Sequence, residues 1–160
     1  MKKLFLSVTF AVLLVSCKTQ APAAKTNIDR KSNMAIKGNW TIKSVTYPGS
    51  DFIKVTSFDL ADAQCFVGST WNFISNNDSG DMTLSKSGCP QITTKIKWYV
   101  NKEEQFVLKF LDESLKAKKV KEGYILKVVD QTENSFKLYD GANVGGKMVD
   151  IVYQFEKNNK

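Results

Sequence analysis

The sequence predicts an all-β fold, an eight-stranded antiparallel up-and-down barrel. Apolar and polar residues alternate along eight segments, as they do in strands that bury one face. Gly, Asn, Asp and Pro separate these segments, so most connections are short turns. Closing such a meander into a barrel removes both exposed edges. The long crossover connections of a two-sheet sandwich are not evident in the chain.

The eight predicted strands comprise residues 39–47, 69–75, 81–86, 91–100, 105–111, 123–130, 135–139 and 148–156. In the first strand, Trp40, Ile42 and Ser44 share one face, and in the second strand Trp71 and Phe73 share one face. Later strands repeat this spacing with Met82 and Leu84; Ile96, Trp98 and Val100; Phe106, Leu108 and Phe110; Phe136 and Leu138; and Val149, Ile151, Tyr153 and Phe155. The strand that contains Leu126 is apolar on both faces.

Three connections are longer. Residues 59–64 are the one plausible helical piece, with Ser57 as its cap. Residues 112–121 are polar and fit either a loop or one helical turn. Residues 140–146 contain three glycines and are expected to form a loop.

Residues 1–16 have the layout of a signal peptide. Lys2 and Lys3 precede an apolar run of 12 residues, shorter than the ~20 that a membrane span needs. The following Leu14-Val15-Ser16-Cys17 resembles the bacterial lipobox. The resemblance implies cleavage before Cys17, diacylglycerol on its sulfur and a further acyl chain, such as palmitate, on the new amine. Two or three chains give a durable membrane anchor; an ordinary secretory leader with an incidental Cys17 is the alternative.

Residues 17–37 lack apolar periodicity and are rich in Lys, Thr, Ala, Asn and Ser. This composition predicts a lipidated, flexible tether before one barrel domain at residues 38–157. Lys18 is not the acidic residue that often signals retention in the inner membrane. We therefore expect a protein of the bacterial cell envelope, anchored in the outer membrane and facing the periplasm or the surface.

The basic surplus is scattered over the chain. Removing Lys2 and Lys3 with the leader lowers the formal charge from +7 to +5. One dense run, residues 116–121, could touch an anionic membrane surface, although a solvated loop is the simpler interpretation. No aromatic residue is interleaved in this run, and export also argues against a nucleic-acid partner.

Two cysteines remain once Cys17 is assigned to lipid. In an oxidising compartment Cys65 and Cys89 are expected to form a disulfide that closes a loop of 25 residues, although two free thiols are the alternative. A zinc site is disfavoured because the chain has no histidine. We expect no metal and no cofactor.

No catalytic constellation stands out, and we expect no enzyme activity. Without histidine, a Ser-His-Asp triad and His-based acid–base chemistry are impossible. The acidic pairs Glu103-Glu104 and Asp112-Glu113 lie in predicted turns beside lysines, where carboxylates stay solvated. Asp130 could give a barrel cavity one polar group, but a solvent position at the strand end is the simpler interpretation.

Several motifs are distributed over the predicted strands in order: Gly38-Asn39-Trp40, CFVGSTWNF at residues 65–73, Cys89-Pro90, Ile96-Lys97-Trp98, Gly123-Tyr124-Ile125-Leu126 and Tyr153-Gln154-Phe155. In this set the chain resembles the lipocalin family, and more closely the lipocalin-like lipoproteins of Bacteroidetes-type bacteria. The resemblance implies a lipocalin-like barrel with Trp40 packed at its closed end. The arginine that usually packs against this tryptophan is absent, and Lys147 and Lys157 are the basic residues in that region.

The resemblance further implies that a small hydrophobic ligand binds inside the barrel. The candidate lining residues are the bulky inward-facing ones: Trp40, Trp71, Phe73, Trp98, Phe106, Phe110, Leu126, Phe136, Tyr153 and Phe155. The same rings could instead fill the barrel, since interiors pack densely. The protein would then be an interaction module whose loops dock an envelope protein or inhibit an exported protease.

The connection at residues 48–68 discriminates between the two functions. It is unusually apolar, with Phe52, Ile53, Val55 and Phe58. It either covers the barrel mouth as a lid, which favours the ligand, or is exposed as a docking patch, which favours the partner.

Overall fold

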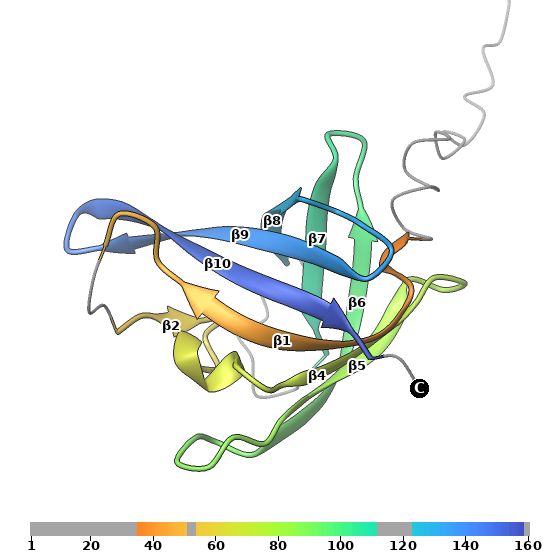
Figure 1. Ribbon diagram of the computed structural model, residues 1–160, viewed down its shortest axis with the longest axis horizontal. Helices are drawn as coiled ribbons and strands as arrows, with labels where there is room; N and C mark the ends of the chain where they lie inside the picture. Colours follow the sequence, from red (N-terminus) through yellow and green to blue (C-terminus); the bar gives the residue numbers. More distant parts are fainter. Residues whose placement is uncertain (1–34, 51–53, 112–122, 159–160) are drawn as a thin grey trace, which may run out of the picture.

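The computed structural model describes residues 35–50, 54–111 and 123–158. Its main body is a closed antiparallel barrel in the order β1-β10-β9-β8-β7-β6-β5-β4 (Figure 1). The barrel strands are β1 (Gly38–Thr46), β4 (Thr70–Ile74), β5 (Ser79–Leu84), β6 (Ile92–Val100), β7 (Gln105–Phe110), β8 (Tyr124–Val129), β9 (Ser135–Val144) and β10 (Lys147–Lys157). Each strand pairs with its neighbour in the chain, and β1 closes the barrel against both β4 and β10. The predicted fold class is confirmed.

The loop predicted at residues 140–146 is wrong, because β9 and β10 form one long hairpin. Val144 pairs with Lys147, and only Gly145 and Gly146 remain in the turn, both with positive φ. A two-residue hairpin turn with positive φ at both positions favours glycine. The pairing continues past Gly141, so two of the three glycines determine the turn and the third lies within a strand.

The helix predicted at residues 59–64 is also wrong. A short hairpin replaces it, formed by β2 (Thr56–Ser57) and β3 (Ala61–Asp62), and only then does the 3₁₀ helix η1 (Ala63–Phe66) begin. The helix cap is Asp62 and not Ser57, since the Asp62 carboxylate accepts a 2.8 Å hydrogen bond from the Gln64 amide. A helix could not start earlier, because Phe58 and Asp59 have positive φ.

The predicted inward face of β1 is wrong at Ser44, because β1 contains a bulge. The register with β10 shifts between Ile42 and Ser44. After this extra residue, Ser44 is exposed and Val45 is buried. The alternation predicted from Trp40 and Ile42 therefore holds only up to the bulge, as expected where one strand carries an additional residue.

The core already begins before β1. Ile36 is buried, and its carbonyl accepts a 2.7 Å hydrogen bond from the Trp40 indole nitrogen. The Lys157 ammonium lies over the Trp40 ring, 5.5 Å from the ring centroid. A lysine thus makes a cation–π contact with the tryptophan of the Gly38-Asn39-Trp40 motif.

The predicted disulfide is present between Cys65 in η1 and Cys89 in the connection from β5 to β6. It ties the segment after the β2–β3 hairpin to the barrel wall. No helix in the described ranges is long and apolar enough to cross a membrane. The predicted signal peptide, Cys17 and most of the predicted tether lie outside the described residues.

Candidate functional site

The β2–β3 hairpin closes one end of the barrel. We call residues 56–62 the plug hairpin. Figure 1 shows β2 beside the short helix at one end of the barrel, and the described chain starts at the opposite end. The side chain of Phe58, at the tip of the plug hairpin, points into the barrel and is only 4% exposed. Of the apolar residues in this connection, Val55 and Phe58 are therefore buried, whereas Phe52 and Ile53 lie outside the described residues.

Four aromatic rings surround the Phe58 ring. The ring centroids of Phe66, Phe110, Tyr124 and Tyr153 lie 5.2–5.5 Å from that of Phe58. Tyr153 is stacked at 28°, while Phe66 and Tyr124 meet Phe58 edge-on at 78° and 83°. These are the offset-stacked and T-shaped geometries that aromatic pairs prefer. We call the space that the Phe58 ring occupies the Phe58 slot.

Two tyrosine hydroxyls hold the plug hairpin in place. Tyr153 donates a buried 2.6 Å hydrogen bond to the Ser57 hydroxyl, and Tyr124 donates a 3.2 Å hydrogen bond to the Asp59 carboxylate. Burial raises the pKa of Tyr153 well above its ordinary value, and the charge of Asp140 raises it further. Burial, followed by the charge of Asp59, raises the pKa of Tyr124. Both phenols therefore stay protonated and keep donating at neutral pH.

The turn of the plug hairpin is strained. Its central residues Phe58 and Asp59 have φ of 55° and 53°, and the Leu60 amide donates a 3.0 Å hydrogen bond to the Ser57 carbonyl. This geometry is that of a primed turn, which normally takes Gly, Asn or Asp at such positions, so Phe58 is the unfavourable residue. A non-glycine residue held there costs on the order of 1–3 kcal/mol and persists only where the surroundings enforce it. The aromatic contacts of Phe58 and the hydrogen bonds from Tyr153 and Tyr124 hold the turn in this conformation.

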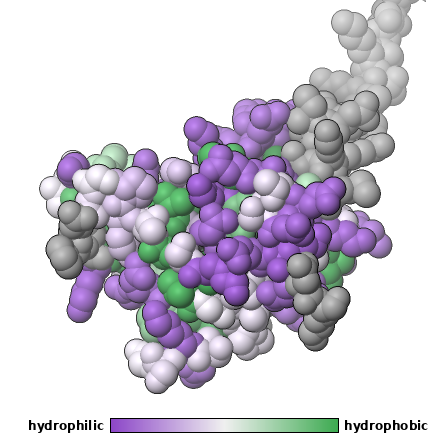
Figure 2. Space-filling model, in the orientation of Figure 1, coloured by the Kyte–Doolittle hydropathy of each residue, from purple (hydrophilic) through white to green (hydrophobic). Residues whose placement is uncertain are grey.

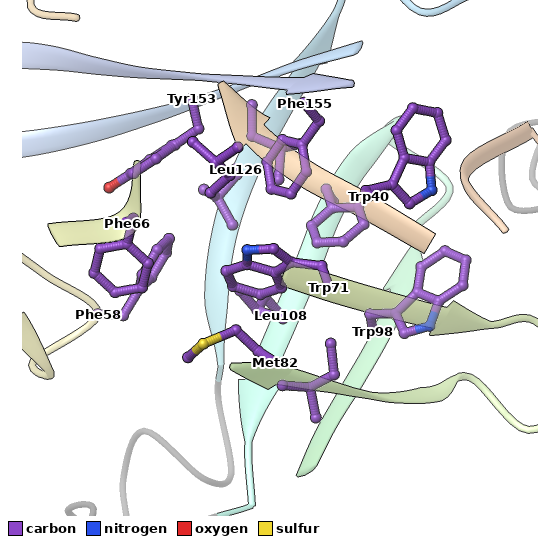
Figure 3. Close-up of a cluster of buried hydrophobic side chains, with 14 of the residues drawn as sticks. Trp40, Phe58, Phe66, Trp71, Met82, Trp98, Leu108, Leu126, Tyr153 and Phe155 are labelled. Atoms are coloured by element: carbon purple, nitrogen blue, oxygen red, sulfur yellow. The ribbon is translucent and has the colours of Figure 1, made fainter. Parts of the chain in front are cut away.

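The barrel is densely packed below the Phe58 slot. Rings from distant strands meet near the axis: Trp71 and Phe155 at 5.7 Å, Phe73 and Phe106 at 5.7 Å, and Trp71 and Phe110 at 6.1 Å. Figure 3 shows Phe58, Phe66 and Tyr153 at one end of the cluster and Trp40 and Trp98 at the other. In the described structure, side chains thus fill the barrel axis.

All ten residues predicted to line the interior are buried, at 2% exposure or less. The structure does not bring them to a single site. Phe110 and Tyr153 contact Phe58, and Trp71 lies next to them. The remaining seven belong to the packed interior: Trp40, Phe73, Trp98, Phe106, Leu126, Phe136 and Phe155.

Sequence reasoning missed two walls of the Phe58 slot, Phe66 and Tyr124. Both were within quoted motifs, after Cys65 and Gly123 respectively. The disulfide at Cys65 was the available signal for Phe66, because a residue beside a bridge is fixed against the barrel.

The wall beside the slot is partly open. β8 pairs with β9 only through residues 127–129, and beyond them the two strands separate around an outward-facing hollow of about 460 Å³. Asp140 lines this hollow, and its charge acts on both Tyr124 and Tyr153. With the plug hairpin seated, the Tyr124 hydroxyl is therefore held by Asp59, and Asp140 adds a negative charge from the side of the hollow.

Asp130 lies in solvent at the end of its strand, as the simpler of the two interpretations predicted. It follows β8 directly with positive φ, is exposed, and forms a 2.7 Å ion pair with Lys137. It gives the interior no polar group. Within residues 35–50, 54–111 and 123–158, no three His, Cys, Asp or Glu side chains are grouped as metal ligands.

No protein-family model matches the sequence, and no curated protein matches it. Among solved structures, bovine odorant-binding protein in complex with a selenium-containing odorant has 11% identity and a TM-score of 0.44, over 77% of this chain and 73% of that chain. Lobster apocrustacyanin A1 has 11% identity and a TM-score of 0.48, over 83% of this chain and 66% of that chain. Membership of the lipocalin-like lipoproteins stays a prediction.

Proposed function

We propose that this protein is a lipid-anchored, lipocalin-like protein of the bacterial envelope which takes up a small hydrophobic molecule at the mouth of its barrel. The supporting observation is that the Phe58 slot is built by three barrel strands and the η1 helix but filled by the tip of a strained hairpin. A ligand could replace one ring without disturbing the barrel strands. Export and anchoring rest on the signal-peptide pattern and Cys17.

The plug hairpin acts as a competitor for the slot. When it is seated, the binding site is occupied, so the apparent affinity for a ligand is the intrinsic affinity reduced by the fraction of open molecules. Weakening the plug hairpin should therefore strengthen binding. This expectation separates a plug from an ordinary core residue, whose removal would only destabilise the fold.

The packed axis favours a second candidate function, a filled barrel that acts as an interaction module. The described surface offers little apolar area for it. The exposed large apolar residues are scattered over different strands and connections: Ile74, Tyr99, Leu111, Ile125 and Met148. One face of the molecule shows apolar residues interrupted by hydrophilic ones (Figure 2). We therefore retain ligand uptake as the leading proposal.

The test measures uptake of 4-(dimethylamino)benzonitrile, a neutral single-ring dye whose fluorescence increases in apolar sites. The protein is the chain from Lys18 onward, exported behind an ordinary cleavable leader so that the disulfide forms without a lipid; all eight barrel strands lie in this part. We expect saturable uptake at one site, and roughly tenfold tighter uptake by Phe58→Ala, because about 1.4 kcal/mol of competition is removed.

Ile74→Ala is the matched control, since Ile74 is exposed on β4 and its loss should not change uptake. Phe58→Leu serves as a second variant if Phe58→Ala does not fold. Absence of uptake by both folded Phe58 variants would overturn the proposal in favour of the filled barrel.

A further inference from the structure

The Phe58 slot has the shape of one aromatic ring. Its walls contact Phe58 face-on at Tyr153 and edge-on at Phe66 and Tyr124. Edge-to-face and stacked contacts depend on the quadrupole of a flat π-system and stabilise a pair beyond the burial of its apolar area. A saturated chain in the same space would keep the burial but lose these contacts. The walls thus favour an aromatic occupant.

The depth of the slot limits the length of the occupant. Phe66 and Phe110 at its base contact Trp71, which in turn packs on Phe73 and Phe155. These three inner rings are at most 2% exposed. A long acyl chain would have to push this packed layer apart, and forcing extra methylenes into a full core is unfavourable. The slot therefore accommodates a single ring.

The Tyr153 hydroxyl is a hydrogen-bond donor beside the slot. The Tyr153 hydroxyl is buried and donates to Ser57, a residue of the plug hairpin. When the hairpin leaves, this hydroxyl loses its partner, and an unsatisfied buried hydroxyl is unfavourable. A ligand hydroxyl or carbonyl oxygen in reach of Tyr153 would replace the Ser57 oxygen.

The walls of the slot disfavour an anionic ligand. The four rings around Phe58 belong to Phe66, Phe110, Tyr124 and Tyr153, and none of these side chains carries a positive charge. A carboxylate buried among them would lose its hydration without gaining a cationic partner. A neutral substituent avoids this loss.

We infer that the ligand is a single neutral aromatic ring with a hydroxyl or carbonyl substituent, bound in place of the Phe58 ring and hydrogen-bonded to Tyr153. This inference rests on the proposed uptake at the barrel mouth. It makes Tyr153 the residue that determines specificity for the polar substituent, and the Phe66, Phe110 and Tyr124 rings the residues that select for aromaticity.

The experiment displaces the single-ring dye 4-(dimethylamino)benzonitrile from the same protein with five probes: p-cresol, benzyl alcohol, toluene, benzoate and palmitate. We expect at least one of the two hydroxyl-bearing rings to compete roughly tenfold better than toluene, as one buried hydrogen bond allows. Benzoate and palmitate should not compete. In Tyr153→Phe, the ratio between the best hydroxyl-bearing ring and toluene should fall to about one.

The ratio is the decisive readout, because loosening the plug hairpin changes both affinities equally. Ser57→Ala is the matched variant: it also breaks the latch but leaves the Tyr153 hydroxyl, so the preference should persist. Displacement by palmitate, or equal competition by toluene and both hydroxyl-bearing rings, would overturn the ligand class while uptake itself stands. If the dye never binds, the proposed function fails and the inference fails with it.

Discussion

The hydrogen bond between Tyr153 and Ser57 allows a quantitative test of the plug hairpin. Both residues are 1% exposed, so neither hydroxyl can turn to bulk water in the closed state. Tyr153→Phe leaves the Ser57 hydroxyl without this partner, and Ser57→Ala does the same to the Tyr153 hydroxyl. Each single change should lower the free energy of unfolding by about 1–3 kcal/mol.

The double variant should cost little more than either single one, because it leaves no orphaned hydroxyl. The resulting double-mutant cycle should give a coupling of about 1–2 kcal/mol. Urea unfolding measures the global effect. Hydrogen exchange at two amides measures the opening of the plug hairpin. The Leu60 amide bonds to the Ser57 carbonyl within the hairpin, and the Ala63 amide bonds to the Val55 carbonyl at its base.

A loss of 1.4 kcal/mol corresponds to about tenfold faster exchange at these two amides. Amides in the β9–β10 hairpin should be much less affected. If the effects of the single variants were strictly additive, or if exchange in the plug hairpin were unchanged, the Tyr153–Ser57 hydrogen bond would not hold the hairpin.

Three further predictions concern stability, each measured by urea unfolding. Gly80→Ala should cost about 3 kcal/mol, because its methyl group would lie 2.0 Å from the Asn72 carbonyl oxygen and force β4 from β5. Reducing the Cys65–Cys89 bridge should cost about 3.5 kcal/mol and speed dye uptake, because the bridge closes a loop of 24-residue separation directly after the plug hairpin. Above pH ~10, the unfolded state releases the Tyr153 proton while the folded state retains it, so Tyr153 should contribute about 1.4 kcal/mol per pH unit to the loss of stability; Tyr153→Phe should lose this contribution and keep that of Tyr124.

Each of these predictions has a matched comparison. Gly141→Ala, also within a strand, would meet only the movable end of Met148 at 3.1 Å and should be nearly neutral. Equal costs for both glycines would contradict the steric argument. If stability and uptake were unchanged after reduction of the disulfide, the bridge would not hold the plug hairpin in place. Parallel alkaline profiles for the parent and Tyr153→Phe would contradict the raised pKa.

The alternating pattern was sufficient for the strands and for the inward side of the barrel. Trp71 and Phe73, or Phe106 and Phe110, lie two or four residues apart, and that spacing places them on one face whatever the neighbouring strands are. The β1 bulge shows the limit of this rule. One inserted residue reverses the facing of Ser44 and Val45, and nothing local in the sequence signals it.

The plug hairpin could not be predicted, because its conformation contradicts the local preference of Phe58. Asp59 tolerates positive φ, but Phe58 is a poor choice for it, so the sequence does not signal a primed turn there. Contacts with Tyr124 and Tyr153, more than 60 residues away in the chain, overrule the preference of Phe58. Sequence reasoning identified an apolar connection but not the single ring that enters the barrel.

The sequence by itself determined the eight-stranded barrel, its aromatic interior and the pairing of Cys65 with Cys89, because strand alternation and cysteine number are local or compositional properties. Only the tertiary structure decided that this interior is filled and that its mouth is closed by a ring from the plug hairpin. Packing density and ring-to-ring geometry depend on side chains brought together from distant strands, and no spacing along the chain encodes them.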